Sequence, residues 1–278
     1  MVSDATAPRV VVHVHVPKMA GSTVFKHFPA VAGIGFCPWQ SVRWPAHPTF
    51  GNTSYYHELL AAHCGHAVRP ACFSSYEAAW DDVLASCRRH RPAAQRPVVL
   101  TMLRSPMAWL FSSLRWNGVD PAALARSGHW RSGHGIDRPL CALSGRRWCS
   151  EHPGVVDASV SRTRLVAHIL RNLNHTDAVF GLAEEYAASM LLLLSQLGFR
   201  KRARAYCDAE SAASVSARDT KEKLHSGSLQ WTVSYDQLQA LIARMATYQE
   251  VYSRASALFY LRLARARRAV CGSGPPNR

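Results

Sequence analysis

Three runs of apolar residues, at positions 10–16, 97–103 and 178–182, stand out against the polar background of the chain. Valine-rich runs of this length, with no strict apolar-polar alternation, are typical of strands that are buried on both faces of a parallel sheet. The first two runs continue into turn residues and then into a helical pattern. The sequence therefore predicts strand-turn-helix units.

Other segments repeat apolar residues at helical spacing. Beyond the first helix, the pattern predicts helices over residues 74–91, 107–116, 161–173, 184–197 and 235–268. Residues 29–56 are rich in proline, glycine and aromatic residues without a period, and predict an irregular loop region. Alternating strands and helices predict an α/β fold, a parallel sheet flanked by helices.

The chain has 278 residues and no internal Pro/Gly/Ser-rich linker. That length is compatible with one large domain. We expect a single domain over residues 10–271. Residues 1–9 and 272–278 are polar or rich in Pro and Gly, and are expected to be flexible tails.

The formal net charge is +15, which predicts an anionic partner. Basic residues cluster at 88–91, 200–204 and 262–268, although each run could also be a solvated helix face. The sequence lacks zinc-finger spacing and an RNA-binding aromatic signature, so nucleic acid is not the expected partner.

Eight cysteines, none in a Cys-x-x-Cys pair, favour disulfides over a metal site, and no metal is expected. Cys141 and Cys149 are close enough in sequence to close a small loop. No run of 18 apolar residues and no signal-peptide pattern occurs, so the sequence as written predicts a soluble chain.

The first strand runs into Pro17-Lys18-Met19-Ala20-Gly21-Ser22-Thr23. Gly21 allows the backbone to approach a ligand, and Ser22 and Thr23 offer hydroxyls beside the free amides of a helix N-terminus. Lys18 adds a positive charge. The turn predicts an anion site, although the Gly-x-x-x-x-Gly-Lys-Ser/Thr string of nucleotide-binding phosphate loops is absent.

The second strand ends on Arg104-Ser105-Pro106. Because the carboxyl ends of parallel strands meet at one edge of the sheet, Lys18 and Arg104 are expected to face one pocket.

Two motifs together resemble the carbohydrate sulfotransferases, nearest to the heparan sulfate 2-O- and 6-O-sulfotransferases. They are Pro17-Lys18-x-x-Gly21-Ser22-Thr23 and Leu103-Arg104-Ser105-Pro106, the latter followed by Ser112. The resemblance implies a P-loop-like sulfotransferase fold and the donor 3′-phosphoadenosine 5′-phosphosulfate (PAPS). It implies that the first loop holds the 5′-phosphosulfate and the second motif the 3′-phosphate. The implied donor-binding residues are Lys18, Gly21, Ser22, Thr23, Arg104 and Ser112.

Two further segments are similar to the same family. Residues 180–185 resemble a Gly-x-Thr-Glu segment, and residues 218–224, with Thr220 and Lys221, resemble a loop that closes over the nucleotide. Ser105 stands where the family usually has aspartate, and residues 162–164 match an adenine-side motif only in part.

Sulfuryl transfer needs a base for the acceptor hydroxyl and positive charge for the leaving phosphate. Lys18 is expected to support the leaving oxygen. The resemblance points to His66 as the base, with His63 as the alternative, and Glu58 could act instead or orient a histidine. His13 and His15 lie within the first strand and are expected to be core histidines.

The sequence thus predicts a PAPS-dependent sulfotransferase whose acceptor is a carbohydrate or another hydroxyl compound, including a polyanionic glycan. The alternatives are a non-catalytic polyanion-binding protein and a phosphate-loop nucleotide kinase. The resemblance implies the Golgi lumen, where the family's enzymes carry a membrane anchor that this sequence lacks; a cytoplasmic location is the alternative.

Overall fold

The computed structural model describes residues 10–36, 72–76, 80, 98–127, 135–149, 155–207 and 231–272. These residues contain a five-stranded sheet in which every pairing is parallel. The spatial order is β2-β3-β1-β4-β5. The strands are β1 (Val10–Val14), β2 (Gly35–Phe36), β3 (Cys72–Tyr76), β4 (Val98–Leu103) and β5 (Ala178–Leu182). The predicted parallel sheet is confirmed.

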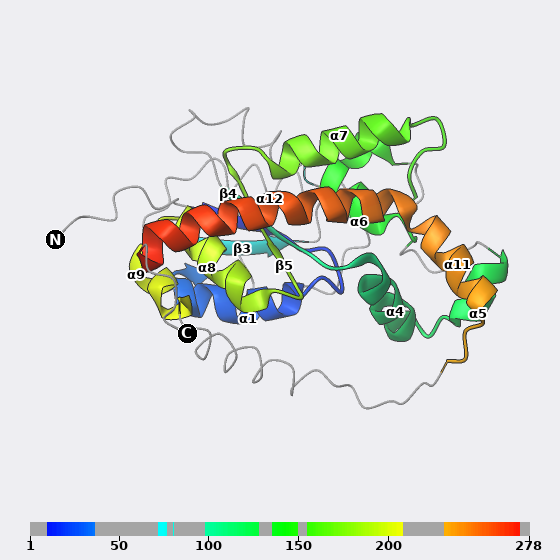
Figure 1. Ribbon diagram of the computed structural model, residues 1–278, viewed down its shortest axis with the longest axis horizontal. Helices are drawn as coiled ribbons and strands as arrows, with labels where there is room; N and C mark the ends of the chain where they lie inside the picture. Colours follow the sequence, from blue (N-terminus) through cyan, green and yellow to red (C-terminus); the bar gives the residue numbers. More distant parts are fainter. Residues whose placement is uncertain are drawn as a thin grey trace.

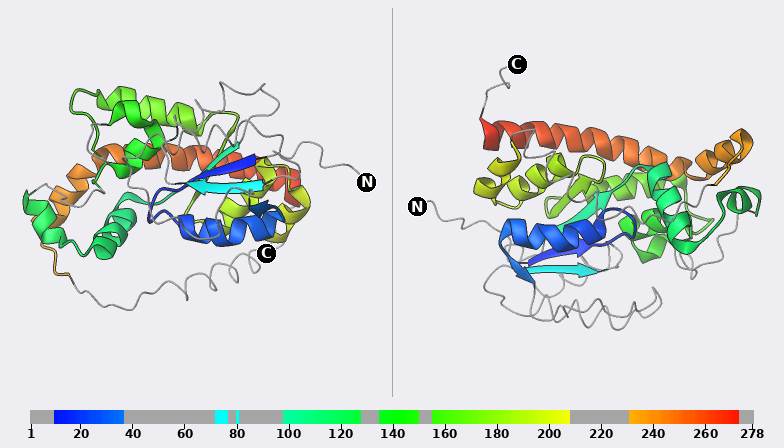
Figure 2. Two further views of the ribbon diagram at one scale, coloured as in Figure 1. Left: turned by 180° about the vertical axis from the view of Figure 1, so that it is seen from behind. Right: turned by 90° about the horizontal axis from the view of Figure 1, so that it is seen from below.

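Helices cover both faces of the sheet, which gives an α/β fold (Figures 1 and 2). On one side lie α1 (Gly21–Ala32) and α8 (Tyr186–Gln196), and on the other α6 (Arg138–Ser144) and α7 (Arg162–Leu173). The long α12 (Ala246–Cys271) packs against β5, α7 and α8. The remaining helices are α4 (Pro106–Asn117), α5 (Pro121–Ser127), α9 (Arg200–Ala203), α11 (Tyr235–Arg244) and the 3-10 turns η2 (Arg146–Trp148) and η3 (Arg204–Tyr206).

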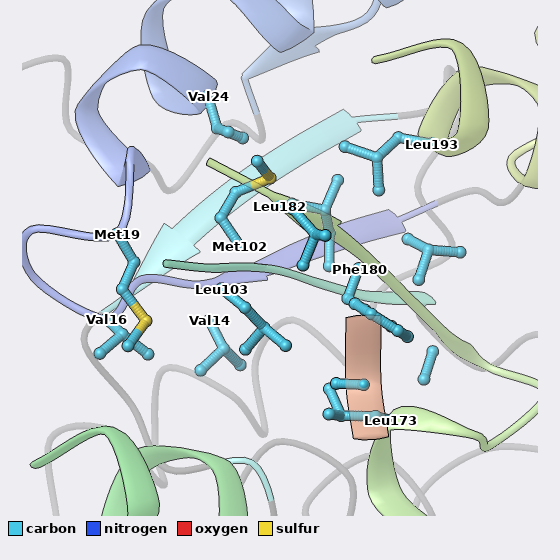
Figure 3. Close-up of a cluster of buried hydrophobic side chains, with 14 of the residues drawn as sticks. Val14, Val16, Met19, Val24, Met102, Leu103, Leu173, Phe180, Leu182 and Leu193 are labelled. Atoms are coloured by element: carbon cyan, nitrogen blue, oxygen red, sulfur yellow. The ribbon is translucent and has the colours of Figure 1, made fainter. Parts of the chain in front are cut away.

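The core is built from alternating side chains of the central strands (Figure 3). Met102 points toward α1 and α8, while the next residue, Leu103, points to the opposite side with Val14. Successive strand residues point to opposite faces, so an all-apolar strand supplies both halves of the core. This explains why β1 is buried at every position.

Three predictions about local structure were wrong. Residues 74–76, expected to begin a helix, belong to β3, which pairs with β1 and β2. The loop region predicted from residue 29 instead begins with the end of α1 and with β2. The helix predicted over 235–268 is divided at Met245, which is buried and ends α11. Each difference follows from packing between distant segments.

Disulfides join Cys141 to Cys149 and Cys207 to Cys271. The first confirms the small loop predicted from the sequence. The second ties the end of η3 to the last residue of α12. Cys72 is also disulfide-bonded, so every cysteine among the described residues is paired.

Candidate functional site

The candidate site lies where β1 and β4 end. These two strands are neighbours, and each is followed by a turn and a helix. β2 and β3, which follow β1 in the chain, lie on one side of it, whereas β4 and β5 lie on the other. The carboxyl ends at such a reversal of strand order are where open parallel sheets place their ligands.

The turn after β1 has an unusual backbone. Lys18 and Ala20 both adopt positive φ, at 66° and 58°, although neither is glycine. Ala20 precedes α1 directly, and its carbonyl accepts the Val24 amide at 3.0 Å. Amides at the start of a helix lack partners within it, and left-handed residues in such turns form concave, anion-binding backbone. Backbone strain of this kind is concentrated at functional sites, which makes the turn the candidate for the anion site that the sequence predicts.

Arg104 connects the two turns. Its Nη1 donates a hydrogen bond of 3.1 Å to the backbone carbonyl of Lys18. The Arg104 side chain is half-buried, and a guanidinium carries five N–H donors, of which this bond uses one. This bond joins the Arg104 side chain to the backbone of the Lys18 turn, while the expectation that both side chains face one pocket stays a prediction.

One stripe of α4 faces the same turn. Trp109 Nε1 donates to the Pro17 carbonyl at 3.0 Å, and the ammonium of Lys18 lies 4.1 Å from the ring centre of Trp116. Residues spaced three and four apart share a helix face. Ser112 lies between the two tryptophans in sequence and, by helical spacing, on the same stripe of α4.

Hydrogen bonds from α12 and from the segment after β5 hold the turn after β4 in place. The buried Tyr248 hydroxyl, on α12, donates to the Arg104 carbonyl at 2.9 Å. Glu184, just after β5, accepts the Ser105 amide at 2.9 Å and the Tyr252 hydroxyl at 3.0 Å. The backbone on both sides of the Arg104–Ser105 bond is thus held by hydrogen bonds from distant segments.

The bracing tyrosines stay protonated at physiological pH. Burial raises the pKa of Tyr248 far above its ordinary value. Burial also raises the pKa of Tyr252, and the neighbouring Glu184 carboxylate raises it further. A phenol that keeps its proton acts as a hydrogen-bond donor and not as a base. Both side chains therefore position the turn.

His13 and His15 are buried within and just after β1. The His13 ring stacks on His15 at 5.6 Å between ring centres and on Phe73 at 6.0 Å. Burial, and then the nearby His15, holds the pKa of His13 well below its ordinary value. Both are core histidines, as expected.

Of the other predicted site residues, the structure describes some and not others. Gly21 opens α1, and Thr23 is buried at 6% exposure on the inner side of that helix. The predictions for His63, His66, Thr220, Lys221 and Glu58 lie outside the described residues. Among the residues that the structure describes, no group of three His, Cys, Asp or Glu could hold a metal ion.

Sequence reasoning missed the bracing residues. In the sequence, Glu184 stands out only as part of residues 180–185, and neither Tyr248 nor Trp109 carries a signal beyond helical spacing. Their roles depend on contacts across at least 79 residues of sequence.

The site and fold define an α/β protein with two cation-bearing turns at the carboxyl edge of a parallel sheet. No protein-family model and no curated protein sequence matches this chain.

Proposed function

We propose that this protein is a PAPS-dependent sulfotransferase with a P-loop-like sulfotransferase fold, acting on a hydroxyl of a carbohydrate acceptor. The observation that carries the proposal is the contact between Arg104 and the Lys18 carbonyl. It brings two cation-bearing turns together, as a donor with two separate anionic groups requires. A nucleoside triphosphate, in contrast, carries its phosphates in one continuous chain.

The charged and hydrogen-bonding groups at the two turns fit such a molecule. Lys18 and the first amides of α1 offer a point charge and preorganised donors for the 5′ end. Arg104 offers a planar fork suited to a phosphate, and Ser112 shares a stripe of α4 with Trp109 and Trp116, which contact the turn after β1. The donor supplies an activated sulfuryl group, whose transfer leaves negative charge on a phosphate oxygen.

The chain's own residues have distinct proposed roles. Lys18 stabilises the charge that develops on the leaving oxygen, while Arg104 and Ser112 orient the nucleotide end. In the same proposal His66, with His63 as the alternative, removes the proton from the acceptor hydroxyl. Tyr248 and Glu184 contact neither the nucleotide nor the acceptor in this proposal, and they hold the Arg104 turn in place.

Disulfides also bear on the compartment. The Cys141–Cys149 and Cys207–Cys271 bonds persist in oxidising surroundings such as the secretory pathway. We therefore propose a lumenal location, with the Golgi as the family resemblance implies. Among the described helices, none has the length and apolar character needed to cross a bilayer.

The first test is thermal unfolding with adenosine 3′,5′-bisphosphate, the donor without its sulfuryl group, in the absence of magnesium. At about 100 times its dissociation constant, a ligand specific for the folded state stabilises it by roughly 2.7 kcal/mol. We expect that stabilisation with the bisphosphate and much less with ATP. No shift with the bisphosphate, or an equal shift with ATP, would contradict the proposal.

Variants locate the binding. Ser112→Ala removes a proposed phosphate ligand without touching the Arg104–Lys18 contact, and Arg104→Lys keeps the charge but loses the fork. Both are expected to weaken bisphosphate binding by at least about tenfold, the equivalent of 1.4 kcal/mol. The control is Ser127→Ala, on α5, which removes a hydroxyl that donates to the Ala123 carbonyl at 2.9 Å. A bisphosphate-induced shift in unfolding temperature as large in Ser112→Ala and Arg104→Lys as in the wild type would show that the bisphosphate binds elsewhere.

A further inference from the structure

A second basic region lies at the opposite end of α12 from the candidate donor site. It is formed by the α9–η3 segment and the last turns of α12 (Figures 1 and 2). All of its charged side chains are exposed. We name these seven residues the distal basic surface: Arg200, Lys201, Arg202, Arg204, Arg265, Arg267 and Arg268.

Tertiary structure joins the two basic runs, which are far apart in sequence. The Cys207–Cys271 disulfide links the end of one run to the end of the other. Arg204 Nε also donates to the Val270 carbonyl at 3.3 Å. The positions of the two runs relative to each other are therefore fixed by a covalent bond and a hydrogen bond.

The described residues that form this surface include no carboxylate. Residues 199–207 and 251–272 contain neither Asp nor Glu. Within the part of the chain that the structure describes, no ion pair joins the seven residues to a carboxylate. Among the described residues, the α12 side chains that bond to carboxylates are Tyr252, Arg254 and Tyr260, all before the distal basic surface. An ordinary solvated helix face mixes both signs of charge, so this concentration of one sign favours an anionic partner.

Distance separates this surface from the donor site. Tyr248, near the start of α12, contacts the Arg104 carbonyl. At 1.5 Å per residue, Arg267 lies roughly 28 Å farther along the helix axis. A mononucleotide bound beside Arg104 does not reach it. The surface therefore needs a ligand of its own or a long one.

We propose that the distal basic surface binds an extended acidic polysaccharide, one that bears sulfate or carboxylate groups. Arginine forks match the geometry of both groups, and cations spread over two elements suit a polymer better than a single small anion. The Cys207–Cys271 bond within the surface favours an oxidising compartment, where acidic polysaccharides and not nucleic acids are the abundant polyanions. This binding goes beyond the proposed sulfuryl transfer and requires no donor.

Heparin serves as the probe, and its dissociation constant is measured against salt concentration. The variant Lys201→Glu/Arg268→Glu changes one residue in each run. The control Arg126→Glu/Arg244→Glu makes the same change in net charge at exposed positions on α5 and α11.

Near 0.15 M salt, where the Debye length is about 8 Å, the distal variant is expected to lose at least about tenfold in affinity. By analogy with nucleic acids, the slope of log affinity against log salt should flatten by about 1–2. The control is expected to stay within about twofold of the wild type.

Equal losses in the two double variants would overturn the proposal, because net charge alone would then explain binding. Unchanged affinity in a folded distal variant would overturn it as well. So would a DNA duplex that binds as tightly as heparin and depends on the same two residues. Bisphosphate-induced stabilisation is measured on the same variant. If it is retained, the loss of heparin affinity is independent of nucleotide binding at the candidate donor site.

Discussion

The hydroxyl of Tyr248 donates a hydrogen bond of 2.9 Å to the backbone carbonyl of Arg104, across 144 residues of sequence. Tyr248 is 1% exposed, and its ring packs edge-on against Trp109, with 6.4 Å between ring centres. Trp109 in turn bonds to the Pro17 carbonyl. One buried aromatic pair therefore connects α12 with both turns of the candidate site.

Removal of this hydroxyl is expected to destabilise the fold and loosen the site. Tyr248→Phe leaves the Arg104 carbonyl without that donor, a loss of about 1–2 kcal/mol in the free energy of unfolding. It should also weaken bisphosphate binding, because Arg104 is less well positioned. Urea denaturation and calorimetric titration measure the two effects. The control Tyr235→Phe alters a tyrosine that is 73% exposed, and an equal effect there would contradict the bracing role.

His13 predicts a loss of stability in mild acid. Its pKa is lowered in the folded state, so below about pH 6.5 the unfolded chain takes up a proton that the folded chain does not. The contribution of His13 is therefore present above pH 6.5 and decreases as the pH falls, with a slope that approaches about 1.4 kcal/mol per pH unit.

The variant His13→Val tests this prediction. Urea denaturation between pH 7 and about pH 5.5 is expected to show a flatter stability profile than in the wild type, since valine does not titrate. His27→Gln, on the half-exposed side of α1, serves as the control. A profile for His13→Val as steep as that of the wild type would assign the acid sensitivity to other groups.

Gly181 leaves no room for a side chain. A Cβ there would lie 2.6 Å from the Ser189 Cβ and 2.7 Å from the Met102 sulfur. Gly181→Ala is therefore expected to destabilise the fold by about 1–3 kcal/mol through overpacking between β5 and α8. Gly35→Ala is the matched control, since a Cβ at Gly35 has nothing within 4 Å. Denaturation curves of equal midpoint would show that α8 can move away.

The two disulfides are expected to differ in their contributions. Cys207–Cys271 spans a sequence separation of 64 residues, and Cys141–Cys149 spans 8. The loop-entropy model assigns about 4 kcal/mol to the longer loop and about 2.5 kcal/mol to the shorter. The double variants Cys207→Ser/Cys271→Ser and Cys141→Ser/Cys149→Ser, compared by denaturation, measure this difference. A larger loss from the shorter loop would contradict the entropic account.

The sequence by itself determined the elements whose signals are local. The apolar run of β5 and the proline that begins α4 are readable because neighbouring residues favour these structures. The same local signals identified Lys18 and Arg104 as cations that follow parallel strands. The Cys141–Cys149 loop was predictable because its two cysteines lie close together in sequence.

Tertiary structure decided the rest. β3 is a strand because it pairs with β1 and β2, although its serines interrupt the apolar pattern. The helix break at Met245 separates a segment that packs on α5 from one that packs on α7 and α8. The contact of Arg104 with the Lys18 carbonyl, the brace from Tyr248 and the joining of two basic runs all depend on distant contacts. Such contacts arise when the whole chain buries its apolar surface, and no local sequence window records them.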